Sequence, residues 1–165
     1  MENIVTYSKT QRQLLLYEIL YTSYEIMMED LMHRLNVSKK TIQRDMKDLT
    51  DAGLIRLTYS GKNKSYKCEK ADGVISETEG TARFSHLKKL RRLAIFMEEL
   101  SEASDDSVGE EYNCKERYFE LFPEVSERTR MRDYEILNKI GYTIRWDEFE
   151  KRHIVEGYLH RIRDI

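Results

Sequence analysis

The sequence has few cysteines, prolines and glycines and no long apolar run. Its 165 residues include two cysteines, one proline and seven glycines. So little proline and glycine excludes a chain built of long irregular loops and favours helices. No stretch approaches the roughly 20 consecutive apolar residues of a membrane span, and the N-terminus lacks the apolar core of a signal peptide. We therefore expect a soluble, intracellular protein that does not contact membranes.

Sequence signatures of catalysis and of metal binding are also missing. Cys68 and Cys114 form no CxxC pair, and we expect both to be reduced structural residues. No GxxxxGK[ST] or GxSxG motif is present. The histidines do not stand at metal-ligand spacing with cysteines or carboxylates; they are His33, His86, His153 and His160. We expect a protein that is not an enzyme and that holds no metal or cofactor.

The net charge of −2 hides an uneven distribution. On its own, this near-neutral total argues against a nucleic-acid binder, because such domains are often strongly basic. However, residues 1–70 hold 12 basic and 9 acidic residues, whereas residues 71–125 hold 7 and 13. Residues 38–47 alone hold four basic residues and one acidic residue. The acidic middle of the chain therefore masks a locally basic segment.

The most informative feature is an internal repeat. Residues 37–57 read VSKKTIQRDMKDLTDAGLIRL, and residues 125–145 read VSERTRMRDYEILNKIGYTIR. Seven of the 21 positions are identical at an offset of 88. In the first copy they are Val37, Ser38, Thr41, Arg44, Asp45, Leu49 and Gly53; in the second they are Val125, Ser126, Thr129, Arg132, Asp133, Leu137 and Gly141.

Each copy predicts the same succession of elements. Ser38 and Ser126 are placed as N-caps, and Gly53 and Gly141 stand where a helix ends at positive φ. A hairpin follows each glycine, and a short amphipathic helix precedes each serine, at 28–35 and 112–122. Longer helices are expected before these, at about 8–22 and 83–102. We take residues 71–82 as a linker and residues 101–111 as an acidic loop.

Residues 11–57 resemble the winged helix-turn-helix domain of bacterial DeoR-type and WYL-associated transcription regulators. The resemblance rests on Met28–Met32, on Leu35–Met46 with its Ser-x-x-Thr-x-x-Arg-Asp pattern, and on Leu49 and Gly53–Ile55. It covers about the first 70 residues, and residues 83–160 resemble the same module more weakly. The resemblance implies a recognition helix that docks on operator DNA.

Candidate DNA-contacting residues follow from the predicted helix and wing. Ile42, Met46 and Leu49 share one helix face, so the residues opposite them are exposed. Gln43 suits adenine and Arg44 suits guanine or phosphate, while the lysines suit phosphates. The first-copy candidates are Ser38, Lys39, Lys40, Thr41, Gln43, Arg44 and Lys47 on the helix, with Lys62, Asn63 and Lys64 in the wing turn. Asp45 and Asp133 are expected to be structural, paired with a nearby Arg or Lys or with a backbone group.

The second copy is a less clear DNA reader. Its candidates are Arg128, Thr129, Arg130 and Arg132. Arg130 takes the position of core residue Ile42, and Glu127 replaces Lys39. Extra apolar stripes on helices 8–22 and 83–102 leave two interpretations open: a thick core, or contact between modules or between two chains.

These features predict a mainly α fold with small β-hairpins, built as two tandem winged helix-turn-helix modules. The expected domains are residues 1–70, the linker 71–82 and residues 83–165. The predicted function is sequence-specific binding of double-stranded DNA by a cytoplasmic, nucleoid-associated bacterial regulator, with repression as the default. It would use helix 38–52 and its wing, with helix 126–140 as a second possible reader, and we expect a homodimer. The alternative is a protein–protein or dimerisation module without sequence readout.

Overall fold

The computed structural model describes residues 5–103 and 112–158. Within these ranges it contains six α-helices and five strands, which form two small antiparallel sheets. The mixed helical and hairpin class expected from the sequence is confirmed. The chain divides after Ala94 into two compact units, called unit 1 and unit 2 below.

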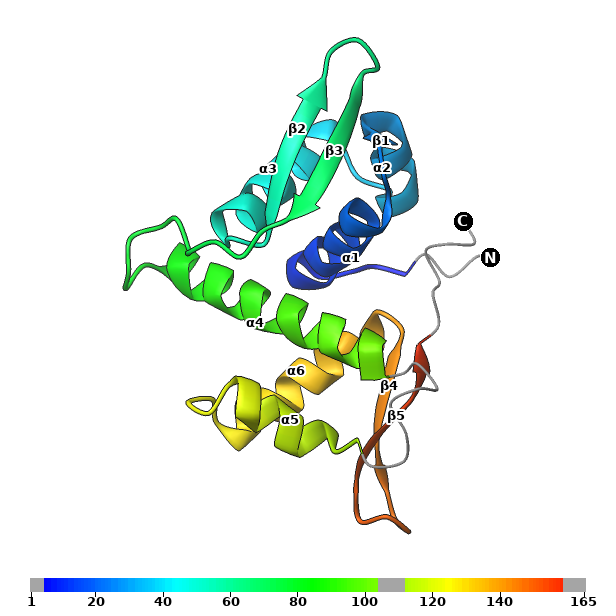
Figure 1. Ribbon diagram of the computed structural model, residues 1–165, viewed down its shortest axis with the longest axis vertical. Helices are drawn as coiled ribbons and strands as arrows, with labels where there is room; N and C mark the ends of the chain where they lie inside the picture. Colours follow the sequence, from blue (N-terminus) through cyan, green and yellow to red (C-terminus); the bar gives the residue numbers. More distant parts are fainter. Residues whose placement is uncertain (1–4, 104–111, 159–165) are drawn as a thin grey trace. The chain divides into compact units, whose positions relative to one another are not determined.

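Unit 1 contains three helices followed by a hairpin. Its elements are α1 (Lys9–Thr22), β1 (Ile26–Met27), α2 (Met28–Leu35), α3 (Lys39–Asp51), β2 (Ile55–Ser60) and β3 (Ser65–Lys70). The antiparallel sheet has the order β1-β3-β2, and the turn of the β2–β3 hairpin projects beyond the helices of the unit (Figure 1). The sequence did not predict β1, because two residues are too short to show an alternating pattern.

The connection between α2 and α3 is a tight turn with a capped exit. Asn36 ends α2 in the left-handed conformation, at φ 51°. Two residues later the Ser38 hydroxyl accepts a hydrogen bond from the Thr41 backbone N–H, as the sequence predicts. The turn and cap fix where α3 starts relative to α2.

The predicted apolar stripe of α3 is buried. Ile42 and Leu49 are fully buried and Met46 is 4% exposed. Each such side chain contributes about 1.5–3 kcal/mol when it is removed from water. This burial fixes the rotation of α3 about its axis and therefore decides which of its residues face solvent.

Most residues of the other apolar stripes are also buried. On α4 (Ala82–Ala103), the fully buried residues are Leu87, Leu90, Leu93, Ala94, Phe96, Met97 and Leu100. On α1, Leu14 and Tyr17 are buried, whereas Tyr24, which lies beyond the end of α1, is 83% exposed. The stripe of α4 is therefore not available to a second chain.

The segment expected to be a linker is attached to unit 1. Ala71 N–H donates to the Leu54 carbonyl at 2.9 Å, and Ser76 N–H donates to the Asp51 carbonyl at 2.7 Å. The Arg91 guanidinium donates to the Gly73 carbonyl at 2.6 Å. Because this segment and the first half of α4 are tied to unit 1, the units divide within α4 rather than at residues 71–82.

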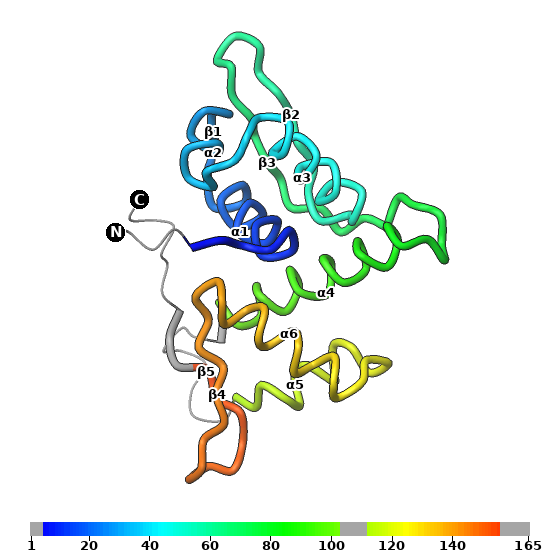
Figure 2. The backbone as a smooth tube through the Cα atoms, turned by 180° about the vertical axis from the view of Figure 1, so that it is seen from behind, coloured from blue at the N-terminus to red at the C-terminus, as the bar shows by residue number. Residues whose placement is uncertain are grey.

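Unit 2 begins with the second half of α4 and repeats the succession of helices and hairpin. Its further elements are α5 (Cys114–Leu121), α6 (Glu127–Lys139), β4 (Tyr142–Asp147) and β5 (Arg152–Tyr158) (Figure 2). Ser126 caps α6 as Ser38 caps α3, and Gly141 follows α6 at φ 118°. The Phe96 ring packs edge-on against Tyr118 and stacks with Tyr134 in the core. Of the expected acidic loop, residues 104–111 lie outside the described residues.

Candidate nucleic-acid interface

The exposed face of α3 carries four cations and a glutamine. Lys39, Lys40, Gln43, Arg44 and Lys47 are all exposed. Spacings of three and four residues place them on one side of the helix, opposite the buried stripe. Of the other two candidates on this segment, Thr41 is half-buried and Ser38 is exposed, and both are engaged in the helix cap.

Two acidic residues of α3, Asp45 and Asp48, point away from that face. Asp45 is 1% exposed and accepts two hydrogen bonds from the Arg12 guanidinium, from Nε at 2.6 Å and from Nη2 at 3.1 Å. Asp48 is 7% exposed and pairs with Lys9 at 2.9 Å and with Arg83 at 2.8 Å. The prediction that Asp45 is a structural residue paired with an arginine is confirmed.

This division of charge leaves the outer face of α3 positive. Lys39, Lys40 and Arg44 form no ion pair with any residue in the described ranges. Lys47 pairs with Asp51 at 2.6 Å, but Lys47 is largely exposed, and exposed pairs are weak. Each cation can therefore bind an external anion with little loss of free energy from broken ion pairs.

A buried hydrogen-bond network holds α3 against α1. The Gln13 amide nitrogen donates to Asp45 at 3.0 Å and to Asp48 at 2.8 Å. The Gln13 amide oxygen therefore accepts from the Nε2–H of His86, at 2.8 Å. Burial lowers the pKa of His86, which favours this neutral form of the ring.

Ion pairing also keeps the network charged at neutral pH. Burial opposes ionisation of Asp48, but hydrogen bonds from Lys9, Arg83 and Gln13 outweigh it and lower the pKa of Asp48. The hydrogen bond with Asp45 raises the pKa of Arg12. The orientation of α3 thus rests on groups that remain ionised in the neutral range.

The wing turn presents two lysines and is braced by a distant carboxylate. Lys62, Asn63 and Lys64 are exposed between the paired residues Ser60 and Ser65. A Glu25 carboxylate oxygen accepts from the Asn63 side-chain amide at 3.2 Å and from the Ser65 hydroxyl. These two bonds lower the pKa of Glu25. This contact has no local signature in the sequence, because Glu25 precedes the wing turn by more than 30 residues.

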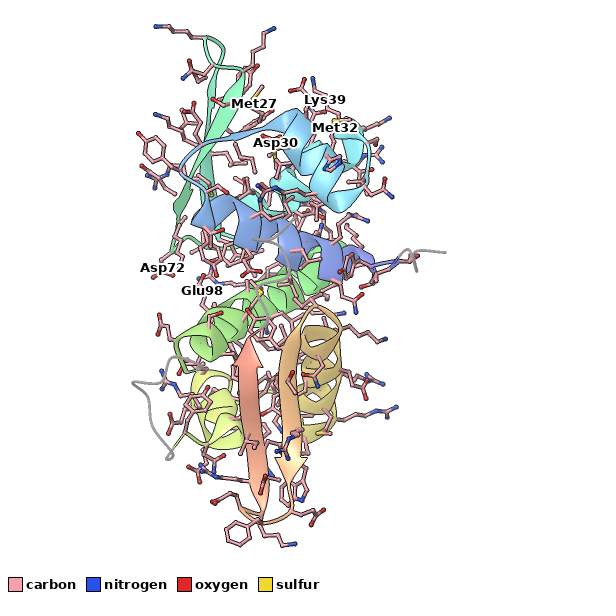
Figure 3. The ribbon with its side chains drawn as sticks, turned by 90° about the vertical axis from the view of Figure 1, so that its right-hand side faces the viewer. Met27, Asp30, Met32, Lys39, Asp72 and Glu98 are labelled. Carbon is pink, nitrogen blue, oxygen red and sulfur yellow. The ribbon has the colours of Figure 1, made fainter. Side chains whose placement is uncertain are left out.

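The wing turn and the start of α3 lie at the same end of unit 1. Lys39, the first residue of α3, is at the end toward which the β2–β3 hairpin turn projects (Figure 3). The two groups of predicted first-copy residues are therefore presented by one end of the unit, as a helix face and a neighbouring loop.

The structure corrects the prediction for Arg130 in the second copy. This side chain is 1% exposed, so it cannot contact DNA from α6. Its guanidinium bonds to Glu127, and its central carbon lies 4.7 Å from the centre of the Tyr134 ring. The reason is helical phase: Arg130 occupies the inward position that Ile42 occupies in α3.

The remaining outer face of α6 has mixed charge. Arg128 and Arg132 are exposed and Thr129 is half-buried. At the repeat offset of 88, Glu127 and Glu135 stand where α3 has Lys39 and Lys47, and Met131, 41% exposed, stands at the position of Gln43.

The hairpin turn of unit 2 also differs from the wing turn of unit 1. It presents Glu148, Phe149 and Glu150, with Phe149 92% exposed. Neither α6 nor this turn offers the concentration of cations found in unit 1.

Metal-ligand clusters and membrane-spanning helices are both absent from the described residues. Residues 5–103 and 112–158 contain no group of three or more His, Cys, Asp or Glu side chains placed to hold a metal ion. Over the same ranges, no helix combines the length and apolarity needed to cross a membrane.

A comparison with known protein families finds a match within unit 1. No curated protein and no solved structure matches the chain. Residues 12–63 match the family model described as HTH domain. The matched residues begin in α1 and end in the hairpin turn, so they include the whole of α3 and two of the three wing-turn candidates. Residues 12–63 therefore form a helix-turn-helix DNA-binding domain.

Proposed function

We propose that this protein is a transcription regulator that reads double-stranded operator DNA through the outer face of α3. The observation that carries the proposal is the separation of charge on this helix. The acidic side chains of α3, which are Asp45, Asp48 and Asp51, are all ion-paired. In contrast, Lys39, Lys40 and Arg44 face outward without a partner among the described residues. This helix lies within the segment that matches a DNA-binding domain.

The proposed mechanism is insertion of α3 into the major groove, N-terminal end first. Gln43 can pair with adenine and Arg44 with guanine through two hydrogen bonds each. Lys39, Lys40 and Lys47 would contact phosphates and so set the register of the helix. The exposed wing lysines, Lys62 and Lys64, would contact the adjacent backbone.

The finer assignment extends the resemblance to the regulators named above. We infer a DeoR-type winged helix-turn-helix protein of bacterial type that associates with the nucleoid and represses by occluding promoters. Unit 2 would be a second, divergent winged-helix module, as its matching order of elements and Ser126 cap support. A homodimer would present two α3 helices to two half-sites about one helical turn apart.

Selection from a random duplex library, followed by sequencing, tests the proposal. The wild-type chain is expected to enrich a defined motif. The variant Lys40→Ala with Arg44→Ala should lose that motif, because both side chains are exposed and unpaired and their removal leaves the fold intact. The control Lys88→Ala with Lys89→Ala removes the same charge from α4 and should retain the motif. Absence of any enrichment by the wild-type chain would refute the proposal.

A further inference from the structure

The outer face of α6 has charged side chains with no visible role in unit 2. Arg128, Met131, Arg132, Glu135 and Lys139 are exposed at spacings of three and four residues, so they share one side of the helix. None of the four charged residues forms an ion pair with a residue in the described ranges. Glu124, exposed just before the Ser126 cap, is likewise unpaired within those ranges.

Four of these charged residues are placed symmetrically, in sequence number, about the point between Met131 and Arg132 in the first half of α6. Arg128 and Glu135 are equally far from the midpoint between Met131 and Arg132, and they have opposite charges. Glu124 and Lys139 are also equally far from that midpoint, and they too have opposite charges. If a second α6 packs antiparallel across this midpoint, Arg128 faces Glu135 of the other helix. Lys139 then lies toward Glu124, which precedes the N-cap of the other helix.

We propose that the outer face of α6 is the interface between two copies of this chain, with the two α6 helices antiparallel about a twofold axis near Met131. A twofold interface must be complementary to itself, and the charged residues on either side of Met131 and Arg132 are. Its charges form two cross-helix pairs in each direction, Arg128 with Glu135 and Lys139 with Glu124. Met131 and Arg132 lie beside the axis, where each Met131 faces the Arg132 side chain of the other helix and supplies the apolar part of the contact.

A DNA contact by the same face is the less favourable interpretation. Glu127 and Glu135 would approach phosphates where α3 offers lysines, and the neighbouring hairpin turn adds Glu148 and Glu150. Repulsion between these carboxylates and phosphates weakens DNA binding, whereas in the antiparallel pair Glu135 faces an arginine.

This inference builds on the proposed dimeric DNA-binding regulator and names the surface that joins its two copies. It assigns separate tasks to the repeated helices, since α3 contacts the operator and α6 contacts the other chain. The two assignments can fail independently, because the mass of the protein in solution is measured without DNA.

Charge reversal with rescue tests the interface on the full chain. Sedimentation equilibrium should show a dimer for the wild type. In Glu135→Arg, the new arginine of each copy faces Arg128 of the other copy. In Arg128→Glu, the new glutamate of each copy faces Glu135 of the other copy. Each single variant should raise the dimer dissociation constant about tenfold, since two exposed attractive pairs become repulsive. The double variant Arg128→Glu with Glu135→Arg restores opposite charges and should return the constant to near the wild-type value.

The control Glu116→Arg makes the same charge change on the exposed side of α5 and should leave the dimer unchanged. A wild-type chain that sediments as a monomer would overturn the proposal, as would single variants that dimerise like the wild type. If Glu135→Arg strengthens duplex binding, Arg128→Glu weakens it and neither changes the mass, the face contacts DNA instead. Failure of the wild type to bind any duplex would refute the proposed function and leave the dimer result standing.

Discussion

The buried carboxylate of Asp45 should be the most sensitive polar position in unit 1. It accepts two hydrogen bonds from the Arg12 guanidinium and one from the Gln13 amide, and it is 1% exposed. The change Asp45→Ala removes all three bonds and leaves Arg12 without its partner. Because these bonds join α3 to α1, their loss should also loosen the orientation of α3.

The expected cost follows from the burial of the two partners. Removing one partner of a buried ion pair costs about 3–5 kcal/mol, because the other charge is left uncompensated. The Arg12 side chain is 20% exposed and can regain some water, which favours the lower end, about 3 kcal/mol. For a domain of about 60–100 residues, 1 kcal/mol shifts Tm by about 4–8 °C. Asp45→Ala should therefore lower the Tm of unit 1 by at least about 10 °C.

Scanning calorimetry of the full chain measures this shift, with Glu69→Ala as the matched control. Glu69 pairs with Arg56 at 3.8 Å, but both side chains are 76% exposed. An exposed pair contributes about 0.2–1 kcal/mol, so the control should change Tm by only a few degrees. If Asp45→Ala and Glu69→Ala unfold at the same temperature, the buried network does not hold α3 against α1.

Three further predictions concern unit 1. Glu25→Ala should weaken duplex binding several-fold without lowering Tm by more than a few degrees, because it frees the wing turn; unchanged affinity in a fluorescence anisotropy titration would contradict this. Gly53→Ala should lower the free energy of unfolding, measured in urea, by at least about 2 kcal/mol. The reason is that φ of Gly53 is 74° and the new Cβ would lie 2.6 Å from the Gly73 carbonyl oxygen; an unchanged free energy of unfolding would contradict this. The lowered pKa of Asp48 stabilises the fold above the unfolded-state pKa, near 3.8, and this stability is lost as the pH falls below that value. Asp48→Asn should therefore make the free energy of unfolding depend less on pH in the acid range. An unchanged acid range would contradict the ion pairing of Asp48.

Much of the local structure could be predicted from the sequence, because local signals specify it. The Ser38 and Ser126 caps, the glycines at positive φ and the stripe of Ile42, Met46 and Leu49 all act over a few residues. Helix and strand ends were accordingly placed within about two residues for most elements.

The features that the sequence did not predict depend on contacts between distant residues. Neither the bracing of the wing by Glu25 nor the attachment of residues 71–76 to unit 1 has a local signature. Arg130 shows a different limit. Its charge favoured a surface contact, whereas its alignment with Ile42 favoured a buried position. The side chain is buried, and its guanidinium interacts with Glu127 and with the Tyr134 ring.

The salt dependence of duplex binding tests the central claim, that the outer face of α3 contacts DNA, most directly. With the selected duplex, the logarithm of the binding constant should fall linearly with the logarithm of the salt concentration. Lys40→Ala and Lys47→Ala should each reduce that slope by about one, whereas Lys88→Ala on α4 should leave it unchanged. A slope that stays the same in the α3 variants, or that changes equally in the control, would show that this face does not contact the phosphates.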